Sequence, residues 1–171
     1  MINYILIAFI LIANESAQIQ EPYNPCVLKT DSMIMTSYLF GHTTKIDLAD
    51  KPKIKKNEII AYVDQDTNSC SKTLWILNST DQDISFKAQD LSIQVIREAR
   101  NKFGIWKPIE FWRPSWCGNS YYSETIKSDQ KIKIVTTKYE GQLKKKIRFK
   151  IKLEDRVIYS NSYIGSINKG Q

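Results

Sequence analysis

The residues from Lys146 to Leu153 alternate strictly between cationic and apolar side chains, in the order K-I-R-F-K-I-K-L. Successive side chains of a β-strand point to opposite faces of the sheet, so a period of two predicts one buried face and one solvated face. An amphipathic helix would instead repeat its apolar residues with a period of about 3.6. We therefore expect this segment to lie in a sheet that covers a hydrophobic core. The residues expected on the core face are Ile147, Phe149, Ile151 and Leu153.

Short apolar runs separated by turn residues recur along the chain after residue 32. Strands spaced about 8–12 residues apart in this way are typical of an antiparallel β-sandwich. A helix would also fit Leu91–Lys102, but no other window has a helical period. The predicted fold is therefore all-β, an antiparallel and immunoglobulin-like sandwich. The predicted strands are Met33–Leu39, Lys45–Leu48, Glu58–Val63, Thr73–Asn78, Ile84–Ala88, Ser92–Ala99, Ile105–Trp112, Tyr121–Lys127, Lys131–Thr137, Lys144–Leu153 and Arg156–Tyr163.

The N-terminal segment is expected to be removed from the mature protein. Residues 2–13 are almost wholly apolar, yet they are fewer than the about 20 that a membrane-spanning helix needs. Their length and the small, polar residues up to Ala17 are typical of a signal peptide, and a buried N-terminal strand is the alternative. We predict a signal peptide over 1–17, an extended segment over 18–32 and one domain over 33–168. The mature chain would be secreted or periplasmic and would carry no transmembrane segment.

The three cysteines are Cys26, Cys70 and Cys117. In an oxidising compartment an odd count indicates one disulfide and one free thiol. Counting chain reversals from Thr73 places the loops at 89–91, 113–120 and 138–143 at the same end of the sandwich as Cys70. The predicted disulfide therefore joins Cys70 to Cys117, and Cys26 would be the spare cysteine.

The sequence contains no motif typical of catalysis. His42 is the only histidine, it has no serine or cysteine partner motif, and no two cysteines are closely spaced, so neither a metal site nor a cofactor is predicted. A glycan-active hydrolase with two paired carboxylates is the remaining enzymatic alternative, because such pairs form only in space. The acidic residues expected at turns or on the solvent face are Asp83, Asp90, Glu98 and Glu110. The protein is therefore predicted not to be an enzyme.

Two segments are candidates for binding. The loop at 112–122 is rich in aromatic residues, whose rings can stack on sugars; alternatively, Trp106 and Trp112 fill the core and Pro114–Trp116 covers one end of the sandwich. Residues 127–152 hold ten basic side chains against two acidic ones, in what we predict to be a hairpin. If its strands pair, like charges stand opposite one another, which is unfavourable.

The basic hairpin could bind lipopolysaccharide, an acidic glycan or another anionic envelope component, or its lysines could prevent edge-to-edge strand pairing. Export disfavours nucleic acid as a partner. Because the count of chain reversals also brings Trp116, Tyr139 and Lys144–Lys146 to one end, we expect one combined site there. The candidate ligand-binding residues are Trp112, Trp116, Tyr121, Tyr122, Tyr139, Lys144, Lys145, Lys146 and Arg148.

Several short segments after residue 72 resemble a group of small secreted β-sandwich proteins of Gram-negative bacteria. They are L-W-I-L-N-S-T at 74–80, W-K-P-I-E-F-W at 106–112, C-G-N-S-Y at 117–121, K-Y-E-G at 138–141, Y-S-N at 159–161 and G-S-I-N at 165–168. The resemblance covers a little over half of the chain, and it implies a signal peptide and an immunoglobulin-like fold but no catalytic or ligand residues. The sequence thus predicts a secreted or periplasmic, non-catalytic binding or structural protein, and a carbohydrate-binding module that uses the 112–122 loop is the alternative.

Overall fold

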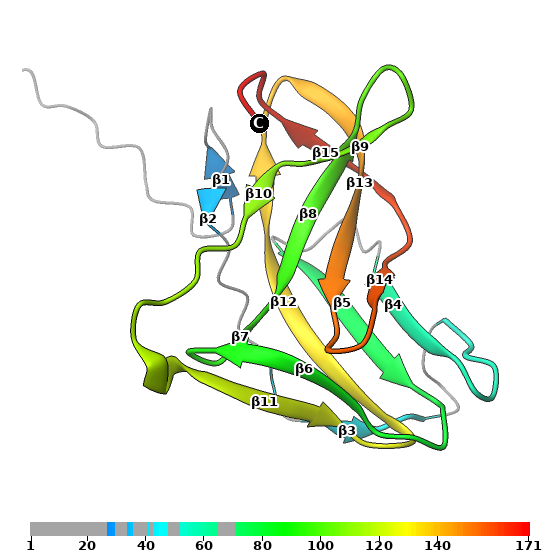
Figure 1. The fold of residues 1–171 in the computed structure, drawn as a ribbon. Coiled ribbons are helices and arrows are strands. Elements are labelled where there is room, and N and C mark those ends of the chain that lie inside the picture. Colours follow the sequence, from blue (N-terminus) through cyan, green and yellow to red (C-terminus); the bar gives the residue numbers. More distant parts are fainter. Residues whose placement is uncertain (1–26, 30–33, 36–40, 42, 48–51, 65–70) are drawn as a thin grey trace, which may run out of the picture.

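The computed structural model describes residues 27–29, 34–35, 41, 43–47, 52–64 and 71–171, which form an all-β molecule (Figure 1). Within these residues the helical segment is a single 3-10 turn, η1 (Gly118–Ser120). The prediction of an all-β fold with antiparallel sheets is confirmed. None of the described residues belongs to a helix with the length and apolar content that would let it cross a bilayer.

The first sheet has five strands and is built on a long strand near the middle of the domain. From one edge to the other it contains β1 (Val27–Lys29), β12 (Gln130–Glu140), β5 (Ser71–Asn78) and β4 (Ile59–Val63), and β3 (Thr44–Lys45) also pairs with β12. The pairing of β1 with β12 is parallel, so part of the segment predicted to be merely extended joins this sheet.

The second large sheet also has five strands. In order they are β14 (Val157–Tyr159), β13 (Leu143–Lys152), β8 (Val95–Arg100) and β9 (Trp106–Pro108), and β15 (Tyr163–Ile167) also pairs with β13. Two smaller sheets complete the fold. They are β11 (Tyr121–Ile126), β6 (Ile84–Gln89) and β7 (Ser92–Ile93) in one, and the parallel pair β10 (Glu110–Phe111) and β2 (Ile34–Met35) in the other.

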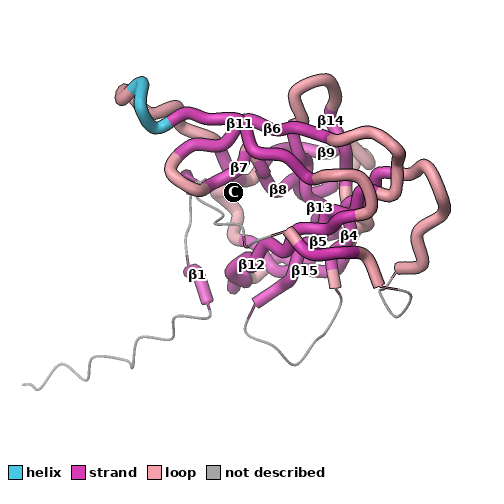
Figure 2. Tube along the Cα trace, turned by 90° about the horizontal axis from the view of Figure 1, so that it is seen from below, coloured by secondary structure: helices cyan, strands magenta, loops and turns pink. Residues whose placement is uncertain are grey.

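The main core lies between the layers that Figure 2 shows from below, with β6 and β11 on one side and β4, β5 and β12 on the other. The alternation read from the sequence is confirmed, because Ile147, Phe149, Ile151 and Leu153 are all buried. Ile132 and Ile134 of β12 are buried in the same core. Full burial of each such side chain contributes about 1.5–3 kcal/mol, so β12 and β13 account for much of the hydrophobic stabilisation.

The prediction that residues 127–152 form a hairpin is wrong, because β12 and β13 follow one another but belong to different sheets. β12 pairs with β5, and β13 pairs with β8, β14 and β15. Lysines therefore do not oppose lysines. Lys131 and Lys133 instead place their ammonium groups 5.4 and 5.8 Å from the centre of the Trp75 ring, where a cation–π attraction replaces the expected repulsion.

Other strand boundaries also differ from the prediction. The segment Leu91–Lys102 contains β7 and β8 and no helix. The predicted strand Arg156–Tyr163 divides into β14 and the start of β15, and between them the hydroxyl of Ser160 accepts a hydrogen bond from the Phe149 amide, at 2.9 Å. The predicted strand Ile105–Trp112 divides at Ile109. Most of the predicted strand Met33–Leu39 lies outside the described residues.

Candidate functional site

The outward side of the β13 sheet carries a concentrated positive charge, and we call it the cationic face. Since Ile147, Phe149 and Ile151 point to the core, the alternate residues of β13 point to solvent, and the strand register places side chains of the neighbouring strands beside them. This face carries six cations against one carboxylate, that of Glu98. The cations are Arg100, Lys144, Lys146, Arg148, Lys150 and Lys152.

Arg148 lies at the centre of the cationic face, between two aromatic rings. Its guanidinium carbon is 4.4 Å from the centre of the Trp106 ring on β9 and 3.9 Å from that of Tyr159 on β14. It also donates from Nε to a carboxylate oxygen of Glu98, at 2.9 Å, and its Nη2 is 2.8 Å from the same oxygen. The cation–π contacts and the paired hydrogen bonds hold the two rings and the guanidinium together in one ordered arrangement.

Trp106 therefore does not fill the core, in contrast to one of the two readings of the sequence, and neither does Trp112. Both are only half-buried, and Trp106 lies on the outer side of its sheet. Glu98 is also placed differently from its prediction, since it is nearly buried between Arg148 and the sheet. Trp106, Tyr159 and Glu98 complete the site, and they were not among the predicted site residues. The alternation of side chains along each strand could have identified them, because each of the three lies on the outward side of its strand.

Beneath the cationic face lies a buried polar cluster of Arg97, Glu110 and Tyr139. The exposed fractions of Arg97 and Glu110 are only 1% each. The Arg97 amide donates to Glu110 at 2.7 Å, its Nη1 lies 3.5 Å from the same carboxylate, and the Tyr139 hydroxyl also donates to it. The Arg97 guanidinium donates to the Thr137 carbonyl and stacks 4.5 Å from the Tyr139 ring. These hydrogen bonds offset part of the free-energy cost of burying such a charge pair.

The surroundings of this cluster change the acidity of Tyr139. Burial, and then the negative charge of Glu110, raise the pKa of the Tyr139 hydroxyl well above its usual range, although Arg97 opposes this shift. The phenol therefore stays neutral and acts as a hydrogen-bond donor inside the protein. The expectation that Glu110 lies at a turn or on the solvent face is wrong. Tyr139, which was predicted to be a ligand-binding residue, is almost fully buried and packs in the core.

The aromatic loop at 112–122 projects from another part of the molecule. Trp116 is 95% exposed, so it does not cover the end of the sandwich. The loop is nonetheless held in place: the Ser115 amide donates to Gln89 at 3.0 Å, and the Tyr121 hydroxyl donates to the Ser115 carbonyl at 3.1 Å. Tyr121 is exposed, and Tyr122 and Trp112 are half-buried.

The predicted site residues are therefore not brought to one end of the molecule. Figure 1 shows η1 and the start of β11 at the lower left, whereas the turn between β12 and β13 lies at the top. Counting chain reversals fails because β12 and β13 lie in different sheets, so the turn between them is not the end of a flat hairpin. Of the predicted residues, Lys144, Lys146 and Arg148 share the cationic face; Lys145 points to the other side of β13 and is half-buried.

The predicted disulfide is not shown. Cys117 is exposed and forms no disulfide within the part of the chain that the structure describes, and Cys70 and Cys26 lie outside that part. His42 lies outside them as well. Cys117 adjoins Trp116 in the same exposed loop, so any bond to Cys70 would form at the molecular surface.

The described residues also line several hollows. An open groove of about 880 Å³ runs along residues 52–57 and mixes lysines with aspartates, so it has no dominant charge. A smaller pocket of about 250 Å³ lies where β15 meets β12. Lys72, Lys138, Tyr139 and Tyr163 contribute to its lining. Its volume is below the about 300 Å³ at which pockets for drug-sized molecules begin.

A scan against protein-family models found no match, and neither did searches of curated proteins and of solved structures. The function of this chain is therefore inferred from its own geometry.

Proposed function

We propose that this protein is an exported, non-catalytic β-sandwich of immunoglobulin-like type that binds an anionic component of the cell envelope through its cationic face. Export is supported by the apolar run over 2–13, and the sandwich is supported by the core between the two layers of strands. The anionic partner would be lipopolysaccharide, an acidic glycan or a layer of lipid headgroups.

The observation that carries this proposal is the position of Arg148 between Trp106 and Tyr159, in line with four lysines of β13. Lysines that only keep a protein soluble do not need ordered aromatic neighbours. Here two rings hold the Arg148 guanidinium at the centre of the face, where an anion can approach several cations at once. The side chains are already ordered, so less conformational entropy is lost on binding.

Salt elution from a heparin column tests the proposal, with heparin as an acidic glycan probe. Replacing Lys146, Lys150 and Lys152 by Gln should lower the salt concentration needed for elution substantially. The matched control removes the same charge from the segment before β4, which does not belong to the cationic face, at the exposed residues Lys53, Lys55 and Lys56. Equal shifts for the two triple variants would mean that heparin detects only net charge, and the cationic face would then not be the site.

A second candidate function rests on the exposure of Trp116. A rigidly held loop with a 95% exposed tryptophan beside Tyr121 offers a platform on which a sugar ring could stack. A glycan array of uncharged saccharides, probed at high salt, tests it, because stacking is not screened by ions. Trp116→Ala should abolish any signal that the Lys146, Lys150 and Lys152 variant retains, and retention of the signal by Trp116→Ala would exclude this loop.

A further inference from the structure

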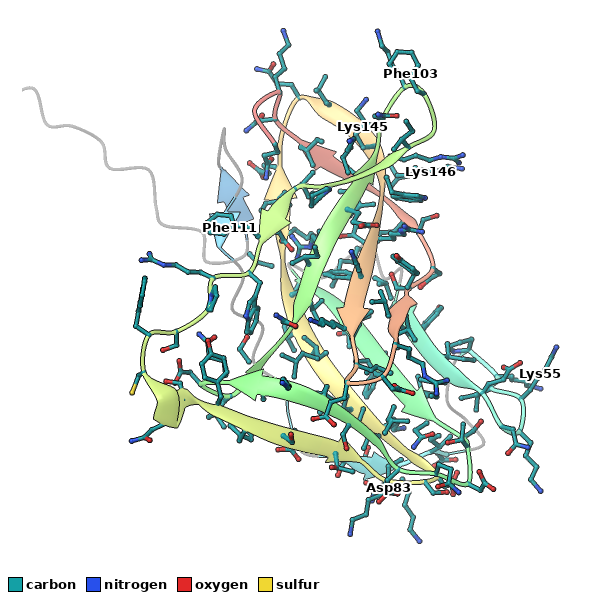
Figure 3. The ribbon with its side chains drawn as sticks, in the orientation of Figure 1. Lys55, Asp83, Phe103, Phe111, Lys145 and Lys146 are labelled. Atoms are coloured by element: carbon teal, nitrogen blue, oxygen red, sulfur yellow. The ribbon has the colours of Figure 1, made fainter. Side chains whose placement is uncertain are left out.

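The hairpin between β8 and β9 ends in an exposed apolar tip, Asn101–Ile105, which we call the hairpin tip. Phe103 is 76% exposed and Ile105 is 54% exposed. Figure 3 shows Phe103 at the far end of this hairpin, projecting beyond the sheet. A single scattered apolar residue on a surface is ordinary, but two large apolar side chains on one projecting turn indicate a contact surface.

The hairpin tip is rigid although it projects. The side-chain oxygen of Asn101 accepts hydrogen bonds from the amides of Phe103 and Ile105, both at 2.9 Å. The Asn101 amide donates to the Ile105 carbonyl at 2.9 Å, and Gly104 closes the turn with a φ of +82° that favours glycine. Arg100 adds a bond from its Nε to the Gly104 carbonyl, at 2.9 Å. The tip thus keeps Phe103 and Ile105 exposed without a flexible loop.

Several cations lie at the same end of the molecule as the hairpin tip. The ammonium group of Lys102 lies 5.0 Å from the centre of the Phe103 ring. Figure 3 places Lys145 and Lys146 at the same end of the molecule as Phe103, and Lys144 precedes them on β13. The turn between β12 and β13 at this end also brings the acidic residue Glu140. An apolar centre within a mainly cationic border matches the chemistry of an anionic membrane surface, where acyl chains lie beneath negative headgroups.

We propose that the hairpin tip inserts shallowly into an anionic lipid bilayer, with Phe103 and Ile105 at the level of the acyl-chain boundary and Lys102 and Lys144–Lys146 among the headgroups. This proposal rests on the proposed function, because it identifies the anionic envelope component as a lipid surface. Long lysine side chains can cover apolar surface with their stems while their ammonium groups stay in the polar layer. With only two apolar side chains inserted, binding should be reversible and weakened by salt.

Co-sedimentation with phosphatidylcholine vesicles, with and without phosphatidylglycerol, tests the proposal. The full chain should bind the mixed vesicles and not those of phosphatidylcholine alone. The double substitution Phe103→Ser and Ile105→Ser should weaken this binding at least about tenfold, since two exposed apolar side chains lose their buried state. The control is Leu91→Ser, which removes an exposed apolar side chain from the β6–β7 hairpin turn. It should leave binding unchanged.

The charge around the hairpin tip is tested separately. Replacing Lys144, Lys145 and Lys146 by Gln should weaken binding about fivefold for each lysine that reaches the headgroups. The Lys53, Lys55 and Lys56 variant is again the matched control. Circular dichroism and thermal unfolding of each variant show whether it is folded, which we expect because these side chains are wholly or partly on the surface.

The outcomes separate this inference from the proposed function. If the protein binds heparin but not anionic vesicles, the inference is overturned and the proposed function stands. If it binds neither, both fail. The inference is also overturned if the Phe103 and Ile105 variant binds vesicles as well as the unmodified protein does, or if Trp116→Ala removes vesicle binding instead.

Discussion

At the scale of single residues, two glutamate–arginine pairs on neighbouring strands have opposite surroundings. Glu110 and Arg97 are almost fully buried, whereas Arg148 of the Glu98 pair is partly exposed beside two aromatic rings. Removing one partner of a buried pair leaves the other charge without compensation in a region of low polarity. Because Arg148 is partly exposed, water can solvate part of the charge that remains when Glu98 is removed. The two pairs should therefore respond very differently to the same substitution.

Glu110→Ala should lower the free energy of unfolding by about 3–5 kcal/mol, because it leaves Arg97 buried without its carboxylate and the Tyr139 hydroxyl without its acceptor. Glu98→Ala should cost less, because the Arg148 guanidinium that it leaves behind is partly exposed to water. Urea denaturation followed by circular dichroism measures both. Similar losses for the two variants would show that burial does not set the energy of these pairs.

The raised pKa of Tyr139 predicts a loss of stability at alkaline pH. Below the ordinary tyrosine pKa of about 10, the phenol is neutral in both the folded and the unfolded protein, and its full contribution is present. Above that pH the unfolded chain ionises Tyr139 while the folded protein keeps it neutral, so stability falls by up to about 1.4 kcal/mol per pH unit. Tyr139→Phe should flatten this fall relative to the unmodified protein. Parallel slopes in unfolding experiments across alkaline pH would contradict the assignment.

The sequence indicated which face of its sheet each side chain occupies, but it did not indicate which strands pair or pack together. The buried positions of β13 and of β12 followed from alternation alone. Arg97 shares the parity of Val95 and Ala99, which marks it as inward-facing, although an arginine there is usually taken to be exposed. The residues next to Glu110 in the sequence do not indicate that Arg97 and Tyr139, which belong to other strands, contact its carboxylate. Such a cluster forms only when the sheets pack together.

At the scale of elements, Gly141 lets the chain pass from the first sheet to the second. A Cβ atom at this position would lie 2.1 Å from the Ile167 carbonyl carbon and 2.7 Å from the Asn168 amide nitrogen. The end of β15 therefore packs directly on the turn between β12 and β13. The two strands separate at this turn, and each pairs with a strand that is distant in sequence.

Gly141→Ala should lower the free energy of unfolding by about 1–3 kcal/mol, because the new methyl group meets backbone atoms that cannot rotate away. Gly118→Ala is the matched control, since a Cβ there would meet nothing within 4 Å. Thermal unfolding of both variants checks the contrast. If Gly141→Ala melts at the temperature of Gly118→Ala, the close contact does not constrain the turn.

Strand positions were largely predictable, and strand partners were not. Turn residues and alternation located β5, β6, β11 and β13 within a residue or two of their observed ends. The breaks at Ile109 and Ser160 depend on contacts with other strands, so the local sequence gives little sign of them. The hairpin assumed for 127–152 failed for the same reason: short connections usually join paired strands, and here the turn at Gly141 instead packs against β15.

At the scale of the whole molecule, export and oxidation remain predictions. Intact-mass measurement of protein isolated from its native host should show that the first 13–18 residues are missing. Peptide mapping without reduction should then link Cys70 to Cys117 and leave Cys26 unpaired. A full-length product in the cytosol would contradict export, and a bond from Cys26 to either partner would contradict the cysteine assignment.

The separation of β12 from β13 also governs the order in which the chain can fold. β5 can pair with β12 only after β12 has been synthesised, and in that pair Asn78 is in register with Gln130. In the same way β8 can pair only later with β13, where Ala99 is in register with Ile147. Only short hairpins such as β8–β9 can close early, because closing long loops is slow. Neither large sheet can be completed until the last third of the chain, which contains β12 and β13, has been synthesised. A chain held unfolded until then suits transport across a membrane, but its unpaired strand edges need protection from aggregation during that time.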